Sequence, residues 1–240
     1  MKPGDAARSK VPRKFFMSLR DLSFWAGSAR ADKLLIRLRR ECGDLTAFDR
    51  LYQQMPDPWS TTVPRFRYQL LKYQKILAAL PERRFHRGLD IGCGLGVMTR
   101  MLAAHADQVL GIDLSPTAVA SASQLSNGAH GVRFRQAELL QIEPLAEPAF
   151  DLITMVDTIY YLPGLTDTVL KSMGEKLVEM LTPDGILLLA NHYYFRFDGL
   201  SRQTKRIHDF FGSQLGLRSV TERRHAFYLV SVFARNPPQT

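Results

Sequence analysis

Three glycines at alternating positions, preceded by an acid, are the residues of this chain whose types and spacing point most clearly to chemistry. The acid is Asp90, and the glycines that follow it are Gly92, Gly94 and Gly96. Glycine lets a strand end in a tight turn and lets a ligand approach the backbone without meeting a Cβ atom. The helix expected over residues 97–106 offers free N–H groups at its first turn. The pattern therefore predicts a ligand-binding turn between a strand and a helix.

A second acid, Asp113, ends the next apolar segment, 23 positions after Asp90. A carboxylate at the end of a second strand can accept hydrogen bonds from both hydroxyls of a ribose. The dinucleotide fingerprint Gly-x-Gly-x-x-Gly would need a glycine at position 97, where the chain has Val97. The order of strand, turn, helix, strand and acid therefore predicts a cofactor site with a different glycine spacing.

The Asp-x-Gly-x-Gly-x-Gly spacing resembles motif I of the class I S-adenosylmethionine-dependent methyltransferases. Asp113, the segment Phe150-Asp151-Leu152-Ile153 and a terminal pair of strands belong to the same likeness, which covers about residues 85–235. The resemblance implies S-adenosyl-L-methionine as the cofactor and methyl transfer as the reaction, with no metal required.

In an open α/β sheet a ligand lies beyond the carboxyl ends of the strands. We expect Asp90 to meet the ammonium of the cofactor through water or the loop, and Asp113 to hold its ribose. Three further residues are expected near the adenine, and two upstream aromatic residues are expected in a lid; in chain order these are Tyr52, Trp59, Leu114, Glu138 and Leu139.

The segment before the glycine loop resembles one particular family within this class of enzymes. Tyr52, Asp57-Pro58-Trp59, Tyr68 and Lys72-Tyr73 are similar to the nodulation protein S (NodS) family. Its members are N-methyltransferases that act on the terminal glucosamine of chitooligosaccharides. This resemblance implies N-methylation of an amino sugar or oligosaccharide. The chain departs from the family in its additional basic N-terminal segment.

Methyl transfer to an amine or a hydroxyl is helped by a group that takes a proton from the acceptor. Three residues that follow predicted strands are candidates for this catalytic role: Asp157, Tyr160 and His192. We expect Asp157 or His192 to be the base. The alternative functions are O-methylation of a glycan, a lipid or a small metabolite, and a non-catalytic cofactor-binding module.

The net charge of +9 is concentrated at one end of the chain. Residues 1–40 hold 11 Lys and Arg against 3 Asp and Glu, whereas the remaining 200 residues are nearly neutral. This distribution argues against a nucleic-acid groove in the body of the protein. Residues 1–14 are expected to be disordered, and a basic amphipathic helix after them could contact a membrane surface or another anionic partner.

The two cysteines, Cys42 and Cys93, do not form a disulfide framework, and no apolar run reaches the length of a membrane span. A cytoplasmic location is therefore expected, with a peripheral position at the inner membrane as the alternative.

Alternating strand and helix patterns follow the glycine loop and predict an α/β fold. The expected fold is a Rossmann-like class I methyltransferase. It has a mostly parallel seven-stranded sheet, an antiparallel terminal strand pair and a basic helical N-terminal extension. We divide the chain into a basic arm over residues 1–43, a helical lid or cap over residues 44–84, and the cofactor-binding domain over residues 85–240. The helix of the cap is expected to start near Pro64.

Overall fold

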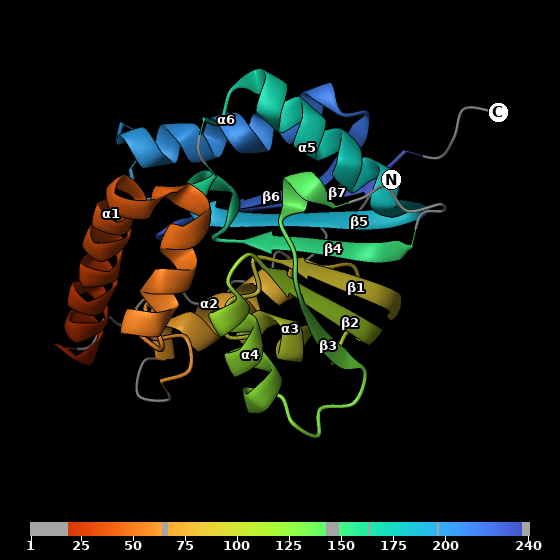
Figure 1. The fold of residues 1–240 in the computed structure, drawn as a ribbon. Helices are drawn as coiled ribbons and strands as arrows, with labels where there is room; N and C mark the ends of the chain where they lie inside the picture. Colours follow the sequence, from red (N-terminus) through yellow and green to blue (C-terminus); the bar gives the residue numbers. More distant parts are fainter. Residues whose placement is uncertain (1–18, 64–66, 143–148, 163, 196, 237–240) are drawn as a thin grey trace.

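A computed structural model describes residues 19–63, 67–142, 149–162, 164–195 and 197–236 (Figure 1). The disorder expected over residues 1–14 and the helix start expected at Pro64 lie outside these residues. The described chain forms seven strands: β1 (Phe85–Ile91), β2 (Ala106–Asp113), β3 (Val132–Gln136), β4 (Phe150–Val156), β5 (Leu181–His192), β6 (Leu217–Arg224) and β7 (Tyr228–Arg235). The α-helices are α1 (Leu19–Gln54), α2 (Arg67–Leu77), α3 (Val97–Leu102), α4 (Pro116–Leu125), α5 (Asp167–Met180) and α6 (Gly199–Gln214).

The strands form one sheet in the order β3-β2-β1-β4-β5-β7-β6. Strands β1 to β5 are parallel, and β7 pairs antiparallel with both β5 and β6. The chain runs outward from β1 in both directions, so β1 and β4 flank the point where the order reverses. In such sheets this switch point is where ligands bind. The sequence-based prediction of the fold class is confirmed.

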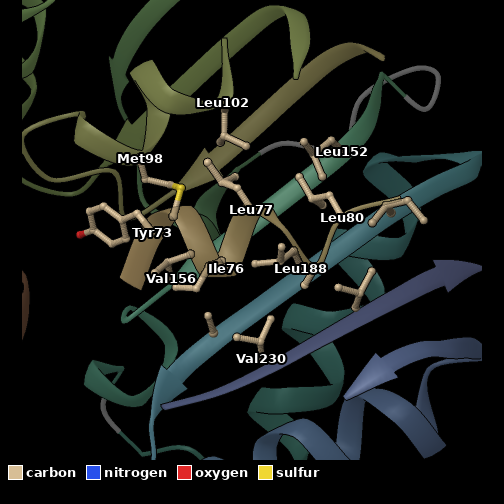
Figure 2. Close-up of a cluster of buried hydrophobic side chains, with 14 of the residues drawn as sticks. Tyr73, Ile76, Leu77, Leu80, Met98, Leu102, Leu152, Val156, Leu188 and Val230 are labelled. Atoms are coloured by element: carbon tan, nitrogen blue, oxygen red, sulfur yellow. The ribbon is translucent and has the colours of Figure 1, made fainter. Parts of the chain in front are cut away.

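Helices cover both faces of the sheet, with α5 and α6 on one face and α2, α3 and α4 on the other (Figure 1). Successive residues of a strand point to opposite faces. Leu188 therefore packs with Ile76 and Leu77 of α2, as Figure 2 shows, whereas its neighbours Leu187 and Leu189 pack under α5 and α6. Because helices bury both faces of the central strands, the sequence of these strands is almost continuously apolar.

One helix is shorter than the sequence predicts. The helix expected over residues 97–106 ends at Leu102, because β2 already begins at Ala106 and pairs in register with Phe85 of β1. The chain reverses between them through hydrogen bonds such as the one from the His105 N–H to the Leu102 carbonyl, at 2.8 Å. The short α3 places the glycine loop directly against the end of β2.

Helix α1 consists of two helical segments that meet at Gly43, whose φ of 78° and ψ of 166° are not helical. It lies beyond the carboxyl ends of the strands (Figure 1), and Leu35, Leu38 and Leu51 are buried. In the second segment, the Asp49 carboxylate accepts hydrogen bonds from the Ser115 hydroxyl and the Thr117 N–H at the start of α4. Part of the expected basic arm is thus a wall of the folded body.

None of the helices in the described parts of the chain is long and apolar enough to cross a membrane. The division into arm, cap and cofactor-binding domain remains a prediction.

Candidate active site

A cavity of about 800 Å³ lies between α1 and the carboxyl ends of the parallel strands. Its lining includes the glycine loop after β1, the residues that follow β2, β4 and β5, and one face of α1. Every cofactor and catalytic residue expected from the sequence lines this cavity except Asp90 and Gly96. The topology therefore gathers residues that are far apart in the sequence into one site.

The glycine loop closes one end of the cavity. Gly92, Gly94 and Gly96 all have positive φ, at 71°, 50° and 72°, a conformation that only glycine adopts without strain. A Cβ at Gly94 would lie 2.7 Å from the Tyr52 hydroxyl, and one at Gly96 would lie 2.5 Å from the Phe134 ring. Gly94 thus keeps the cavity wall open, whereas Gly96 lets α3 pack on the sheet.

Asp113 is fastened beside the loop by backbone donors. Its two carboxylate oxygens accept hydrogen bonds from the N–H groups of Gly94 and Ser115, both at 2.9 Å. Burial raises the pKa of this carboxyl, and the backbone N–H groups of Ser115, Gly94 and Leu114 oppose the rise. Because each carboxylate oxygen has two acceptor positions, these donors do not saturate the carboxylate, and it can still accept from a ligand in the cavity. Leu114, Glu138 and Leu139 line the same end, and Glu138 makes no capping hydrogen bond to the short helix that follows it, Leu139–Gln141.

Asp90 lies behind the loop rather than in the cavity wall. Its side chain accepts hydrogen bonds from the Thr99 hydroxyl at 2.7 Å and from the Thr154 hydroxyl at 2.8 Å. These bonds join β1 to α3 and β4, and the residue is only 2% exposed. Burial raises the pKa of Asp90 to about 6. Asp90 therefore lies beneath the loop, and its expected contact with the ammonium of the cofactor, through water or the loop, stays a prediction.

Asp157, Tyr160 and His192 lie together at the other end of the cavity. The Tyr160 hydroxyl is 2.8 Å from His192 Nδ1, and His192 Nε2 is 3.8 Å from Asp157 Oδ1. Asp157 Oδ2 forms an ion pair with Lys72 of α2. Asp157 has a φ of 54°, which is rare for a residue other than glycine. Such strain is typical of functional sites.

The environment sets the charge of each group in this cluster. Burial alone would raise the pKa of Asp157, but Lys72 and His192 outweigh it and lower the pKa. Burial lowers the pKa of His192, with Asp157 opposing it, and burial raises the pKa of Tyr160 well above its usual value. At neutral pH the cluster therefore holds a carboxylate, a neutral imidazole and a protonated phenol.

These charges also indicate which ring nitrogen of His192 carries the proton. Nε2 faces the Asp157 carboxylate, which can only accept a hydrogen bond, so the ring proton belongs on Nε2. Nδ1 is then an acceptor, and the protonated phenol of Tyr160 donates to it. The cluster can therefore move a proton from the Tyr160 hydroxyl to His192.

The first segment of α1 covers the cavity. Asp32 Oδ1 accepts hydrogen bonds from Trp59 Nε1 at 3.3 Å and from the Tyr161 hydroxyl at 3.1 Å, and Arg39 donates to the Tyr161 carbonyl. Tyr52 and Trp59, the expected lid residues, pack edge to face with ring centroids 6.0 Å apart. The cover therefore includes α1 as well as the segment expected from the sequence.

Asp32 and Trp25 of α1 are among the cavity residues that the sequence pattern does not indicate. The Lys72-Tyr73 pair belongs to the likeness described above, but nothing in the sequence links Lys72 to Asp157, 85 positions away. In the described residues, no group of three or more His, Cys, Asp or Glu side chains is arranged to hold a metal ion.

Comparison with known proteins assigns the domain. A protein-family model described as "Methyltransferase domain" matches residues 89–187, which run from the strand before the glycine loop into β5. This part of the chain is therefore similar to a methyltransferase domain, and it has the fold of the class I enzymes. The predicted resemblance to this class, with NodS among its relatives, is confirmed.

The curated relatives include enzymes with different acceptors. A malonyl-[acyl-carrier protein] O-methyltransferase of Enterobacter lignolyticus is 36% identical over 112 residues, which are 47% of this chain and 41% of the relative. The nodulation protein S of Sinorhizobium fredii is 26% identical over 135 residues, which are 56% of this chain and 60% of the relative. The chain thus spans about two-fifths to three-fifths of the length of these relatives.

Among solved structures, the N-methyltransferase NodS of Bradyrhizobium japonicum in complex with S-adenosyl-L-homocysteine is similar to this chain with a TM-score of 0.62. The sequence identity is 24%, and the match covers 76% of this chain and 93% of NodS. At this identity the likeness shows a shared fold.

Replacing Asp90 with Asn should remove part of the pH dependence of stability. Burial raises the pKa of folded Asp90 to about 6 from 3.8, so the folded state binds a proton more tightly and stability falls as pH rises between these values. Between about pH 4 and about pH 7, the wild type should lose up to about 3 kcal/mol of unfolding free energy relative to Asp90→Asn. Urea unfolding measures both, with the exposed Asp184→Asn as control. Parallel pH curves for wild type and Asp90→Asn would contradict this placement.

Proposed function

We propose that this chain is an S-adenosylmethionine-dependent methyltransferase whose acceptor is a small molecule or an oligosaccharide end. One observation carries the proposal: a single cavity joins the glycine loop and Asp113 at one end to the Asp157–His192–Tyr160 cluster at the other. A methyl donor at the first end and an acceptor at the second would meet beneath α1.

The residues of the first end fit the cofactor. The glycine loop leaves room for a ligand beside the backbone, and Asp113 retains acceptor positions for two ribose hydroxyls. Leu114 and Leu139 offer apolar contacts for the faces of an adenine ring, and Glu138 offers an acceptor for its edge. Bound there, the cofactor supplies a methyl group on a sulfonium, which is already activated for displacement.

At the second end the protein orients the acceptor and takes its proton. The cofactor would supply the methyl carbon to the acceptor's lone pair, and its sulfur would keep the electrons of the carbon–sulfur bond. The acceptor's proton passes to the Tyr160 oxygen as the Tyr160 proton moves to His192 Nδ1. The Asp157 carboxylate stabilises the resulting imidazolium, and α1 excludes water from the cavity.

The proposed acceptor is an amino group of a sugar or oligosaccharide. Sugars present apolar ring faces and hydroxyl edges, which tyrosine and tryptophan side chains can contact with both ring and polar tip. Trp25, Tyr161 and Tyr194 line this end of the cavity together with Tyr160. The likeness to nodulation protein S supports the same acceptor class.

O-methylation is the second candidate, because a specific feature favours it. The Tyr160–His192 pair is neutral and can deprotonate a hydroxyl, while Lys72 already neutralises the carboxylate that would attract an ammonium. A relative that is an O-methyltransferase also matches this chain.

Contact with an anionic membrane surface is proposed for the outer face of α1. Arg30, Lys33, Arg37 and Arg40 are exposed and recur at helical spacing along one stripe. Ile36, which is 52% exposed, lies beside this stripe and lines the cavity. The basic stripe and the cavity thus lie on neighbouring faces of α1, so a surface bound by the stripe would lie near the site.

Replacing Asp113 with Ala should weaken binding of S-adenosylmethionine about ten- to a hundredfold, because hydrogen bonds to a charged acceptor contribute about 1.5–3 kcal/mol. Calorimetric titration measures the affinity. Asp107→Ala, at the exposed start of the same strand, should bind like the wild type. If Asp113→Ala bound S-adenosylmethionine as tightly as Asp107→Ala, with the fold intact, Asp113 would not be the residue that holds the ribose.

Incubation with labelled cofactor and de-N-acetylated chitooligosaccharides should give a product with a methyl group on nitrogen, located by mass spectrometry. A methyl group on oxygen would select the second candidate. Transfer only to a lipid extract would overturn both sugar acceptors. Cofactor binding without transfer to sugars, lipids or small metabolites would indicate a non-catalytic binding module.

Substituting Gln at all four stripe positions should abolish flotation with vesicles that contain phosphatidylglycerol. Wild-type association should weaken as salt rises, because screening shortens the reach of exposed charges. Vesicles of pure phosphatidylcholine, which lack the anionic lipid, serve as the control surface. Equal flotation of wild type and variant, or none by the wild type at low salt, would overturn the membrane contact.

A further inference from the structure

Lys72 is a buried cation beside the catalytic end of the cavity. Its side chain is only 1% exposed, and its ammonium lies 5.5 Å from the centre of the Tyr228 ring. A buried charge is costly unless it is paired, and Asp157 is the partner. Lys75, three residues further along α2, is exposed. The helix therefore directs one of its two lysines into the protein, toward the carboxylate of the cluster.

The Asp157 side chain is held in one orientation. Lys72 binds Oδ2, and the Asp157 N–H donates to the Ala190 carbonyl at 2.8 Å. Oδ1 is buried, has no hydrogen-bond partner among the described residues, and lies 3.8 Å from His192 Nε2. Catalytic hydrogen bonds are often long in the absence of substrate. This distance would shorten once the His192 ring carries a proton on both nitrogens.

We propose that Lys72 is a positioning residue for methyl transfer: by pairing with Asp157 it aims Oδ1 at His192 and keeps the imidazole neutral until the acceptor's proton arrives. The inference rests on the proposed function, because it concerns the same proton path. Lys72 does not line the cavity, so it acts on the orientation of Asp157 and on the charge of His192, and not on the acceptor itself.

The charges around His192 show why a cation is needed behind the carboxylate. The groups that face this ring are Asp157 after β4, Asp32 of α1, Lys72 of α2 and the Tyr160 hydroxyl, with the Tyr194 ring stacked on it at 5.5 Å. The two carboxylates favour protonation of His192, whereas Lys72 and burial oppose it. Without Lys72, the two carboxylates would face the ring without an opposing cation, and the pKa of His192 would rise.

NMR titration of the His192 ring tests this directly in the full chain with S-adenosyl-L-homocysteine bound. The signal is assigned by its absence in His192→Gln. In Lys72→Met the midpoint should rise by about one pH unit or more, because the Asp157 carboxylate, no longer paired with Lys72, would stabilise the protonated His192 ring. Lys72→Arg, which keeps the charge, should restore the wild-type midpoint. Lys75→Met, the matched control on the same helix, should not move it.

An unchanged midpoint in Lys72→Met would overturn the proposal, as would an equal shift in Lys75→Met. Because Lys72→Met leaves a buried carboxylate unpaired, it can fail to fold. The comparison of Asp157→Asn with Asp157→Asn/Lys72→Met then decides, and the midpoint should be higher in the double variant. Equal midpoints would refute the role of Lys72.

The titration needs no turnover, so it separates the two proposals. A shifted midpoint without methyl transfer to any acceptor would confirm the effect of Lys72 on His192 and refute the proposed function. Transfer by the wild type with an unmoved midpoint in Lys72→Met would do the reverse. Where transfer is measurable, the acidic limb of the plot of kcat against pH should move to higher pH in Lys72→Met and should lie at the wild-type pH in Lys72→Arg.

Discussion

The hydrogen bond from the Gly94 N–H to the Asp113 carboxylate is the contact on which the candidate cofactor site depends. It fastens the loop after β1 to the end of β2, and the Ser115 N–H fixes the other carboxylate oxygen. Position 94 requires glycine, because a Cβ there would lie 2.7 Å from the Tyr52 hydroxyl. Asp90, beneath the loop, joins β1 to α3 and β4. The loop is therefore shaped before any ligand arrives, which reduces the entropy lost on binding.

Helix α1 covers the carboxyl ends of the strands and so makes a cavity there. Parallel strands leave their carboxyl ends open, and the chemistry proposed here requires that water be kept out. Asp49 fastens the second segment of α1 to α4, and Asp32 binds Trp59 and Tyr161 across the cavity. Gly43 lies between these two anchors, in open space. The helix that carries the exposed basic stripe is thus also a wall of the site.

Much of this arrangement could be predicted from the sequence, because it follows from topology. Parallel strands end at one edge, so Asp157 and His192 had to come close to each other. Packing decided the rest. Asp90 does not line the cavity, because its two carboxylate oxygens accept hydrogen bonds from the hydroxyls of Thr99 and Thr154 beneath the loop. The pairing of Lys72 with Asp157 depends on how α2 sits on the sheet, which no local pattern encodes. The roles of these residues in binding and catalysis stay predictions.

Amide hydrogen exchange with and without S-adenosyl-L-homocysteine tests the central claim most directly, because it maps where the cofactor binds. The account predicts slower exchange over residues 91–96, 113–115 and 138–140, and over residues 48–62, where the chain covers the cavity. Residues 217–224, in the edge strand β6, should exchange at the same rate in both samples. No slowing at the glycine loop and at Asp113, or slowing confined to other parts of the chain, would contradict the account.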